Sequence, residues 1–170
     1  IAKALKSYGF TDAQIVTYPS GEAWRGLKGE LWELSPFRQK LASFQDEVAM
    51  LVNGSQPADV TAELVWVGSG TKAEIDAAKV EGKIVVTDGS ASGVHSEACL
   101  NQGALGVISI AMSRPYFDPL QMPWSGLRGR RPPATAGTAE AEAKPKFAFQ
   151  LPVREGDYLK KRLLAREKIT

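Results

Sequence analysis

The stretch from Val80 to Ile110 constrains the fold of this chain most, because it contains two strand patterns separated by a short helix pattern. Lys83 to Thr87 is an apolar run rich in β-branched residues and bounded by glycines, which is typical of a strand buried on both faces. Ala104 to Ile110 is again small and apolar. The sequence therefore predicts a β-α-β unit with a right-handed crossover.

The segment between those two strands carries the start and stop signals of a short helix. Ser90, Ser92 or Gly93 can cap its N-terminus, and Gly103 can adopt the left-handed conformation that ends a helix. Gly106 lies inside the second strand, which predicts close backbone packing there. One side of this helix carries the apolar residues Val94, Ala98 and Cys99.

Weaker patterns predict the remaining elements. Thr71 and Glu74 have the spacing of a capping box, so a helix should follow them through Ala78. Apolar residues also occur at helical spacing from Ile1 and again from about 155 to 165, which predicts a helix in each segment. Prolines make 112–124 a loop, and the small and charged composition of 126–146 predicts a mobile loop. We expect strands at 14–18, 29–34, 48–52, 60–68 and 147–151, the last with one buried face, and an irregular polar segment after Ser35.

Composition excludes several functional classes. The 170 residues are 44% hydrophobic, which suits one compact domain. The net charge of +2 is too small to attract nucleic acid to the molecule as a whole. A single cysteine excludes an internal disulfide. No apolar run approaches the roughly 20 residues that span a bilayer. Because the chain begins at Ile1 inside a helix pattern, we expect an excised fragment of a longer protein.

The candidate catalytic residues are few. A catalytic zinc site usually needs two or more histidines, or histidine with carboxylates, and this chain has only His95. We expect His95 in a loop or at a helix N-terminus, as a capping or surface residue. Asp88, Ser90 and Ser92 could be combined with it into a triad, but no nucleophile elbow supports that. The 88–93 loop lacks the motifs of a nucleotide site, and Cys99 is expected in the core.

The candidate binding residues lie in and after the proline-rich loop. Trp124, among prolines, is the best candidate for an exposed contact, whereas Trp24, Trp32 and Trp66 are most simply core residues. A basic run near Trp124 could contact an acidic peptide, a phosphate or a partner protein, although a solvated loop is the simpler interpretation. Together with position in the loop, these arguments select Arg114, Tyr116, Phe117, Trp124, Arg128, Arg130 and Arg131.

The order of these segments resembles the protease-associated domain. The resemblance rests on VTAELVWVGSGT from Val60, EGKIVV from Glu81, SEACLNQGALGVIS from Ser96 and FAFQLPVREGDYLKKRLL from Phe147. It implies a mixed α/β fold of the swivelling β/β/α type, with a twisted sheet or flattened barrel and short flanking helices. The resemblance also implies that residues 26–170 form this domain.

The flanking residues resemble the opening of a bi-zinc aminopeptidase of the glutamate carboxypeptidase and transferrin receptor superfamily. LKSYGF from Leu5 leads to IVTYP from Ile15, and GELWELSP from Gly29 would begin the inserted domain. In that family the zinc ligands follow the insert. The resemblance implies that residues 1–25 are a remnant of the peptidase domain and that this piece has no catalytic residues or cofactor of its own. Zinc belongs to the parent enzyme.

The same resemblance implies a function and a setting for the module. We expect an accessory domain that borders or caps the active-site cleft, presents the 112–132 loop, and contacts peptide substrate or a protein partner. Its other partner is the parent catalytic domain, and neither nucleic acid binding nor membrane insertion is expected. The family implies an extracytoplasmic location: secreted, periplasmic or at the cell surface.

An alternative function comes from a different class. IVVTDGSASGVHSEA from Ile84 is similar to the phosphohistidine swivelling domain of phosphoenolpyruvate-using enzymes, where a histidine follows a small-residue loop. His95 would then carry a phosphoryl group beside a helix N-terminus. That family favours Gly-Gly-x-Thr/Ser-x-His-Ala, which this sequence matches only in part. The protease-associated interpretation is therefore preferred.

Overall fold

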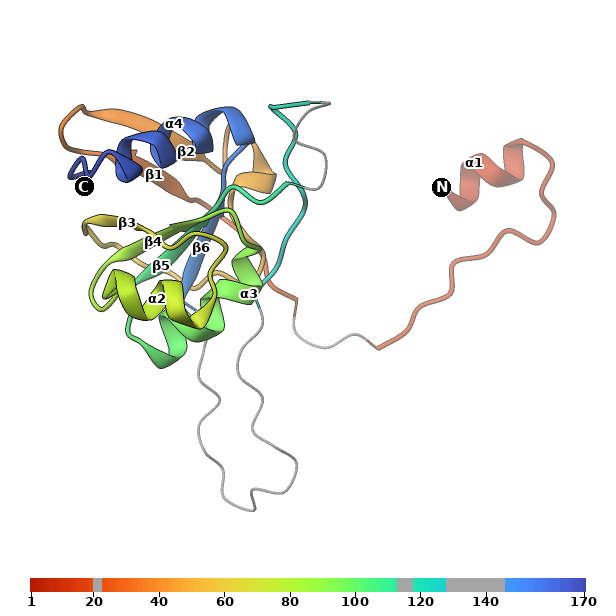
Figure 1. The fold of residues 1–170 in the computed structure, drawn as a ribbon. Coiled ribbons are helices and arrows are strands. Elements are labelled where there is room, and N and C mark those ends of the chain that lie inside the picture. The colour runs from red at the N-terminus through yellow and green to blue at the C-terminus, as the bar shows by residue number, and fades with distance from the viewer. Residues whose placement is uncertain (20–22, 113–117, 128–145) are drawn as a thin grey trace, which may run out of the picture.

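A four-stranded parallel sheet forms the centre of the molecule (Figure 1). The computed structural model describes residues 1–19, 23–112, 118–127 and 146–170. The strands lie side by side in their order along the chain. Short helices and a small antiparallel sheet surround them, so the fold is mixed α/β as predicted. The four strands are β3 (Leu64–Trp66), β4 (Ile84–Thr87), β5 (Gly106–Ser109) and β6 (Phe147–Gln150).

The predicted β-α-β unit is confirmed in β4, α3 (Ala91–His95) and β5. β4 and β5 pair in parallel, with Ile84 opposite Gly106. The Ser90 hydroxyl caps α3 by accepting a hydrogen bond from the Gly93 N–H at 3.2 Å. The helix continues as a π-helical turn, Ser96–Asn101, and Gly103 then takes a φ of 76° as expected. Capping and termination signals thus placed both ends of this element correctly.

Close packing at Gly106 has a specific cause. A Cβ atom at this position would collide with the ring of Phe147 in the neighbouring strand, so only glycine lets β5 and β6 approach in this register. β6 is buried on both faces, not on one as predicted, because layers cover the sheet from both sides. Phe147 and Phe149 alternate with small or polar residues, a pattern that predicted one exposed face. In the folded protein the other face of β6 is covered as well.

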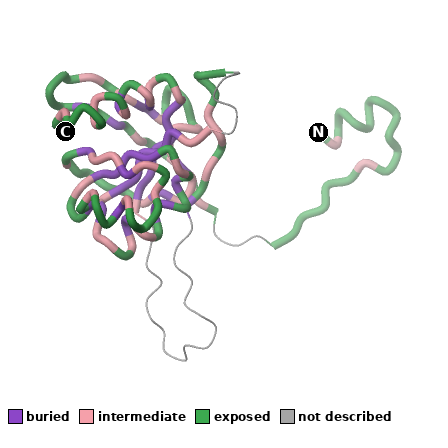
Figure 2. The backbone as a smooth tube through the Cα atoms, in the orientation of Figure 1, coloured by how far each residue is buried: buried purple, intermediate pink, exposed green. Residues whose placement is uncertain are grey.

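Two layers of helices and strands pack on opposite faces of the parallel sheet. One contains α2 (Lys72–Ala78) and α3, and the other contains α4 (Val153–Leu164) with β1 (Glu30–Glu33) and β2 (Gln39–Ser43) (Figure 1). The predicted capping box is present, since Thr71 and Glu74 cap each other at the start of α2. Figure 2 shows that burial concentrates in the strands between these layers.

Four local expectations are corrected. Residues 14–18 form no strand, and residues 48–52 form a 3₁₀ helix, Val48–Met50, followed by a single bridge at Leu51 instead of a strand. The polar segment after Ser35 contains β2, which pairs antiparallel with β1. β3 is shorter than the apolar run 60–68. The described strands form two separate sheets, so the sheet alternative holds and the flattened barrel does not.

A buried ion cluster joins the small sheet to α4. The Arg162 guanidinium donates to both carboxylate oxygens of Glu33, at 2.7 and 2.9 Å, and to Glu167 at 2.7 and 2.9 Å. The Glu33 side chain is fully buried. Burial disfavours the charged carboxylate and by itself would raise the pKa of Glu33. The hydrogen bonds from Arg162 and Gln39 outweigh that effect and hold the pKa below its ordinary value of 4.5. The carboxylates of Glu167 and Glu33 likewise raise the pKa of Arg162.

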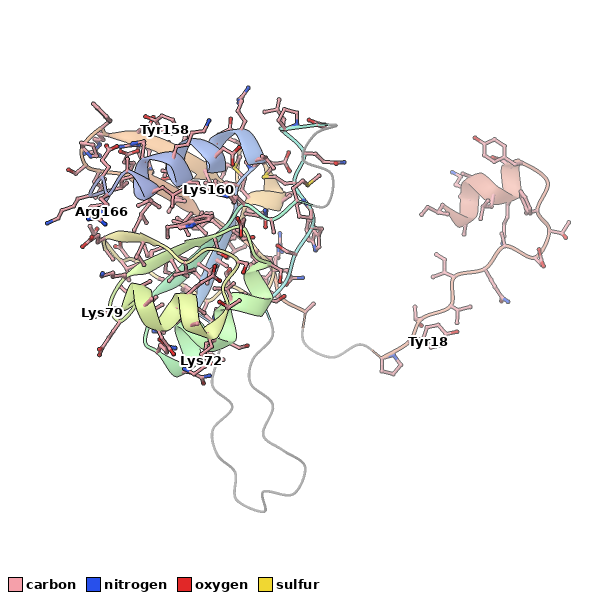
Figure 3. All side chains as sticks on the ribbon, viewed as in Figure 1. Tyr18, Lys72, Lys79, Tyr158, Lys160 and Arg166 are labelled. Atoms are coloured by element: carbon pink, nitrogen blue, oxygen red, sulfur yellow. The ribbon has the colours of Figure 1, made fainter. Side chains whose placement is uncertain are left out.

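A second link runs from α4 to the parallel sheet. Lys160, on α4 in Figure 3, contacts Asp88 Oδ2 at 3.0 Å and lies 4.8 Å from the Trp66 ring centre.

Within the described ranges, no helix is long and apolar enough to cross a membrane.

Candidate interaction surfaces

Three polar side chains lie side by side at the carboxyl ends of β4, β5 and β6. Thr87 is in register with Ser109, and Ser109 with Gln150, and all three are buried. Thr87 donates to the Gly68 carbonyl, Ser109 to the Gly89 carbonyl, and Gln150 to the Ala111 carbonyl, at 2.8, 2.8 and 3.1 Å. These bonds satisfy buried polar atoms and fix the start of the loop that follows β5.

The described part of that loop, 118–127, is attached to the body. Asn53 donates to the Ser125 carbonyl at 3.0 Å and accepts from Leu127 N–H at 2.7 Å, while Arg154 N–H donates to the Pro119 carbonyl at 3.2 Å. Leu127 is buried. The loop is therefore held on both sides of Trp124.

Trp124 is exposed, as predicted for a contact residue. Its relative exposure is 68%, which places a large amphipathic ring in solvent on an anchored loop. It is the candidate binding residue that the structure describes. The other six lie outside the described residues: Arg114, Tyr116, Phe117, Arg128, Arg130 and Arg131. The predicted loop 126–146 is described only at its fixed ends, Gly126, Leu127 and Lys146.

A groove of about 890 Å³ runs beside β1, and the sequence analysis did not find it. Its lining includes the apolar residues Leu41, Leu64 and Phe149. Trp32, Leu34 and Thr170 also line it. Trp32 lines this groove with 40% exposure, so its assignment to the core is wrong; Trp24 and Trp66 are partly buried. Part of its lining comes from β1 and from Leu41 of β2, and β2 lies in a polar segment that gave no strand signal.

His95 lies elsewhere than predicted. It is the last residue of α3, not a loop or N-terminal residue, and its relative exposure is 1%. Its Nε2 atom accepts a hydrogen bond from the Lys146 N–H at 3.0 Å. Burial and the nearby Lys146 charge lower its pKa, so the imidazole is neutral at pH 7. The imidazole is almost fully buried and its Nε2 atom already accepts a backbone hydrogen bond, which argues against a phosphoryl group on Nε2 and so against the phosphohistidine alternative.

The other candidate nucleophiles are engaged in structural roles. Ser90 caps α3, and Asp88 is paired with Lys160. Cys99 is buried as predicted, and burial raises the pKa of its thiol to about 12, so it is protonated at neutral pH. The described residues contain no group of three or more His, Cys, Asp or Glu side chains that could hold a metal ion. Their donor set does not fit a bi-zinc centre.

The N-terminal arm, residues 1–19, presents apolar side chains without covering them. It contains the helix α1 (Ala2–Ser7), which agrees with the predicted helical spacing, and none of the α1 residues is buried. Figure 3 shows Tyr18 on this arm, away from the sheets. Large exposed apolar residues of the arm are Ile1, Leu5, Tyr8, Phe10, Ile15, Val16 and Tyr18.

Two solved peptidase structures share the fold of this chain. The chain is similar to an aminopeptidase from Aneurinibacillus sp. strain AM-1, with a TM-score of 0.57 and 24% identity over 87% of this chain. It is also similar to a peptidase M28 precursor from Shewanella amazonensis SB2B, with a TM-score of 0.51 and 17% identity over 86%. The chain covers 30% and 33% of those proteins, about a third of their length. No family model and no curated protein matches it.

Proposed function

We propose that this chain is a non-catalytic accessory module of a zinc-dependent aminopeptidase, and that it is of the protease-associated type. One observation carries the proposal: almost the whole chain shares its fold with about a third of each of two peptidases. The remaining two thirds of such an enzyme leave room for a separate catalytic domain. The segment order described above, from Val60 to the C-terminal helix, supports the protease-associated type.

The chemistry of the described residues supports a non-catalytic role. The one histidine of the chain is buried and neutral, and the one cysteine is a core thiol with a raised pKa. Zinc in the longer enzyme would polarise the scissile carbonyl and activate a water molecule. Its ligands belong to the part of the enzyme outside this module.

The N-terminal arm supports attachment to a catalytic domain. Its exposed apolar side chains would be costly to leave in water, and Ile15 and Val16 are strand formers. We place residues 1–25 in the peptidase domain, where these side chains become buried. The word precursor in the name of the Shewanella protein agrees with the extracytoplasmic location that we propose for the enzyme.

Trp124 gives the module its contact with substrate or with a protein partner. The ring is exposed while its loop is fixed by hydrogen bonds to Asn53, so binding loses little conformational freedom. An anchored tryptophan is a typical residue for a contact that contributes much of the binding free energy. The module thereby shapes one border of the active-site cleft.

Kinetics of the longer enzyme test this role. Trp124→Ala should raise KM for peptide substrates about tenfold with little change in kcat, or weaken a partner complex by the same factor. Leu120→Ala, an exposed apolar residue of the same loop, is the matched control and should change neither. Stoichiometric zinc and hydrolysis of aminoacyl substrates by residues 1–170 alone would contradict the proposal. Unchanged KM and oligomeric state after deletion of 112–132 would count against the role of the loop.

A further inference from the structure

We propose that His95 and Lys146 form an acid-sensitive latch at the start of β6, and that opening this latch loosens the loop that carries Trp124. The latch itself needs only contacts within this chain. Its effect on binding rests on the proposed function, because that function gives Trp124 its role.

Lys146 joins three segments of the chain just before β6. Its N–H donates to Nε2 of His95 at 3.0 Å, which ties it to the end of α3. Its carbonyl accepts from the N–H of Gln56 at 2.9 Å. Its ammonium group donates to the carbonyl of Ala104 at 2.8 Å, shortly before β5. The start of β6 is therefore fixed by polar contacts in three directions.

His95 can close this latch only as a neutral ring. Its Nε2 atom accepts a hydrogen bond, so the single proton of the imidazole is assigned to Nδ1. A second proton would turn Nε2 into a donor that faces the N–H donor of Lys146. Protonation of His95 therefore breaks the bond to Lys146 instead of weakening it by degrees.

The surroundings of His95 disfavour a positive charge on its ring. The residue is 1% exposed, and within the described residues its Nδ1 atom has no hydrogen-bond partner. Burial, and after it the nearby ammonium group of Lys146, lower the pKa of His95. The same lysine thus makes the latch through its backbone and repels the protonated ring through its side chain.

The elements packed around α3 supply no charge that would offset this repulsion. β5, β6 and the turn 52–56 contain no titratable side chain. In the π-helical turn that follows His95, the Cys99 thiol is protonated, because burial raises its pKa to about 12. Carboxylates on either side of α3 are already paired with lysines: Glu97 with Lys72, and Asp88 with Lys160.

The turn 52–56 connects the latch to the loop 118–127. β6 holds one side of this turn, because the N–H of Val52 donates to the Ala148 carbonyl at 3.0 Å. On the other side, Asn53 makes the two backbone hydrogen bonds that anchor the loop. Release of the start of β6 therefore removes one support of the turn and, through the turn, one support of the loop.

The latch opens as the pH falls. A solvent-exposed imidazole has a pKa of about 6.5, and the latched ring of His95 has a lower one. Above pH 6.5 the ring is neutral whether the latch is open or closed, so the latch is at full strength. Below pH 6.5 the open state takes up a proton first, and the equilibrium shifts toward it until the pH reaches the lower pKa of the latched ring. Within that window the shift is up to about tenfold for each pH unit.

NMR spectroscopy of the chain tests the latch directly, because His95 is its only histidine and gives unambiguous ring signals. The ring should titrate with a midpoint below 6.5, and the Lys146 amide signal should move with the same midpoint. Between pH 7 and pH 5.5, the hydrogen-exchange protection factors of the Lys146, Asn53 and Leu127 amides should fall about fivefold. The amide of Val67, which bonds β4, should keep its protection.

His95→Gln is the matched control, because a glutamine oxygen can accept from the Lys146 N–H but does not titrate in this range. In this variant the three amides should be equally protected at both pH values. A second variant, Lys146→Met, keeps the backbone N–H and removes the ammonium group. It should move the titration midpoint of His95 upward.

A His95 midpoint of 6.5 or above, or unchanged protection of the three amides in the natural chain, would overturn the proposal. An equal loss of protection at Val67 would overturn it as well, because global destabilisation without a local latch gives that result. These readouts do not depend on peptidase activity. An open latch at pH 5.5 together with an unchanged KM for Trp124→Ala in the longer enzyme would remove only the proposed function.

Discussion

The two sheets of this protein differ in how far they are buried. Every residue of β4, β5 and β6 is buried, and side-chain clusters cover both faces of that parallel sheet. In β1 the residues alternate between exposed and buried, and Trp32 lines the groove with 40% exposure. The central strands of the parallel sheet are therefore interior elements, whereas β1 lies at the surface.

The two sheets are also stabilised in different ways. The parallel sheet is assembled from neighbours in sequence and is stabilised by apolar burial. The small sheet is held by residues far along the chain: Arg162 pairs with Glu33, and Thr170 pairs with Ser35. Substitutions of core residues should therefore affect the stability of the parallel sheet most. Substitutions that remove a charge should affect the small antiparallel sheet most.

The largest effect is expected in the parallel sheet. Ile108 in β5 is fully buried, and Ile108→Ala should lower the free energy of unfolding by about 4 kcal/mol through lost burial and a cavity. Urea denaturation followed by circular dichroism measures this change. Ile108→Val should cost about 1 kcal/mol, and an equal cost for both variants would contradict a tightly packed sheet.

The next effect concerns the charge that holds the small sheet. Arg162→Met leaves the buried Glu33 carboxylate without its partner and should destabilise the protein by about 3 kcal/mol. Adding Glu33→Gln to that variant should recover more than half of the loss. Lys40→Met, which breaks the exposed pair with Asp46, serves as the control and should leave the urea midpoint unchanged. A double variant no better than Arg162→Met would show that the charge is not the cause.

The same pair predicts a pH dependence. The pKa of Glu33 is below 4.5 in the folded state, so its stabilisation is present above pH 4.5 and is lost as pH falls through the lower folded value. Unfolding free energies at about pH 5 and about pH 3 should fall more in the natural protein than in Glu33→Gln/Arg162→Met. Parallel curves for the two proteins would rule out this linkage. Arg162 also lowers the pKa of Glu167, so loss of that pair contributes to the difference, whereas carboxylates away from this cluster, such as Glu74 with a pKa of about 2, are common to both proteins.

The smallest effect is expected where β1 faces the groove. Leu34 is 44% exposed, so Leu34→Ala should lower the free energy of unfolding by less than about 1 kcal/mol. Urea titration of residues 1–170 measures this change, and a cost as large as that of Ile108→Ala would contradict an exposed Leu34 side chain.

Elements with strong local signals were predictable. Ser90 and Gly103 marked the helix between β4 and β5, the Thr71–Glu74 box marked α2, and Gly106 marked a close approach. The exposure of Trp124 also followed from its proline-rich surroundings. In each case a short-range steric or hydrogen-bonding requirement is written into neighbouring residues.

Elements that depend on distant contacts were not predictable. Residues 14–18 have a strand sequence but no strand partner here, and β2 has a polar sequence yet pairs with β1. His95 looked like a residue beside a loop, but α3 extends as far as His95 and buries its side chain. Strand formation depends on a partner edge, and local propensity carries no information about that edge.

The β-α-β unit, its helix caps and the mixed α/β class follow from the amino-acid sequence alone, because hydrophobic periodicity and local backbone chemistry specify them. The pairing of β1 with β2, the contacts of Arg162 and Thr170 with them, and the groove beside β1 became visible in the tertiary structure. The Arg162 and Thr170 contacts join residues separated by more than a hundred positions, and the β1–β2 pair forms from a segment without strand alternation, so no local pattern encodes either.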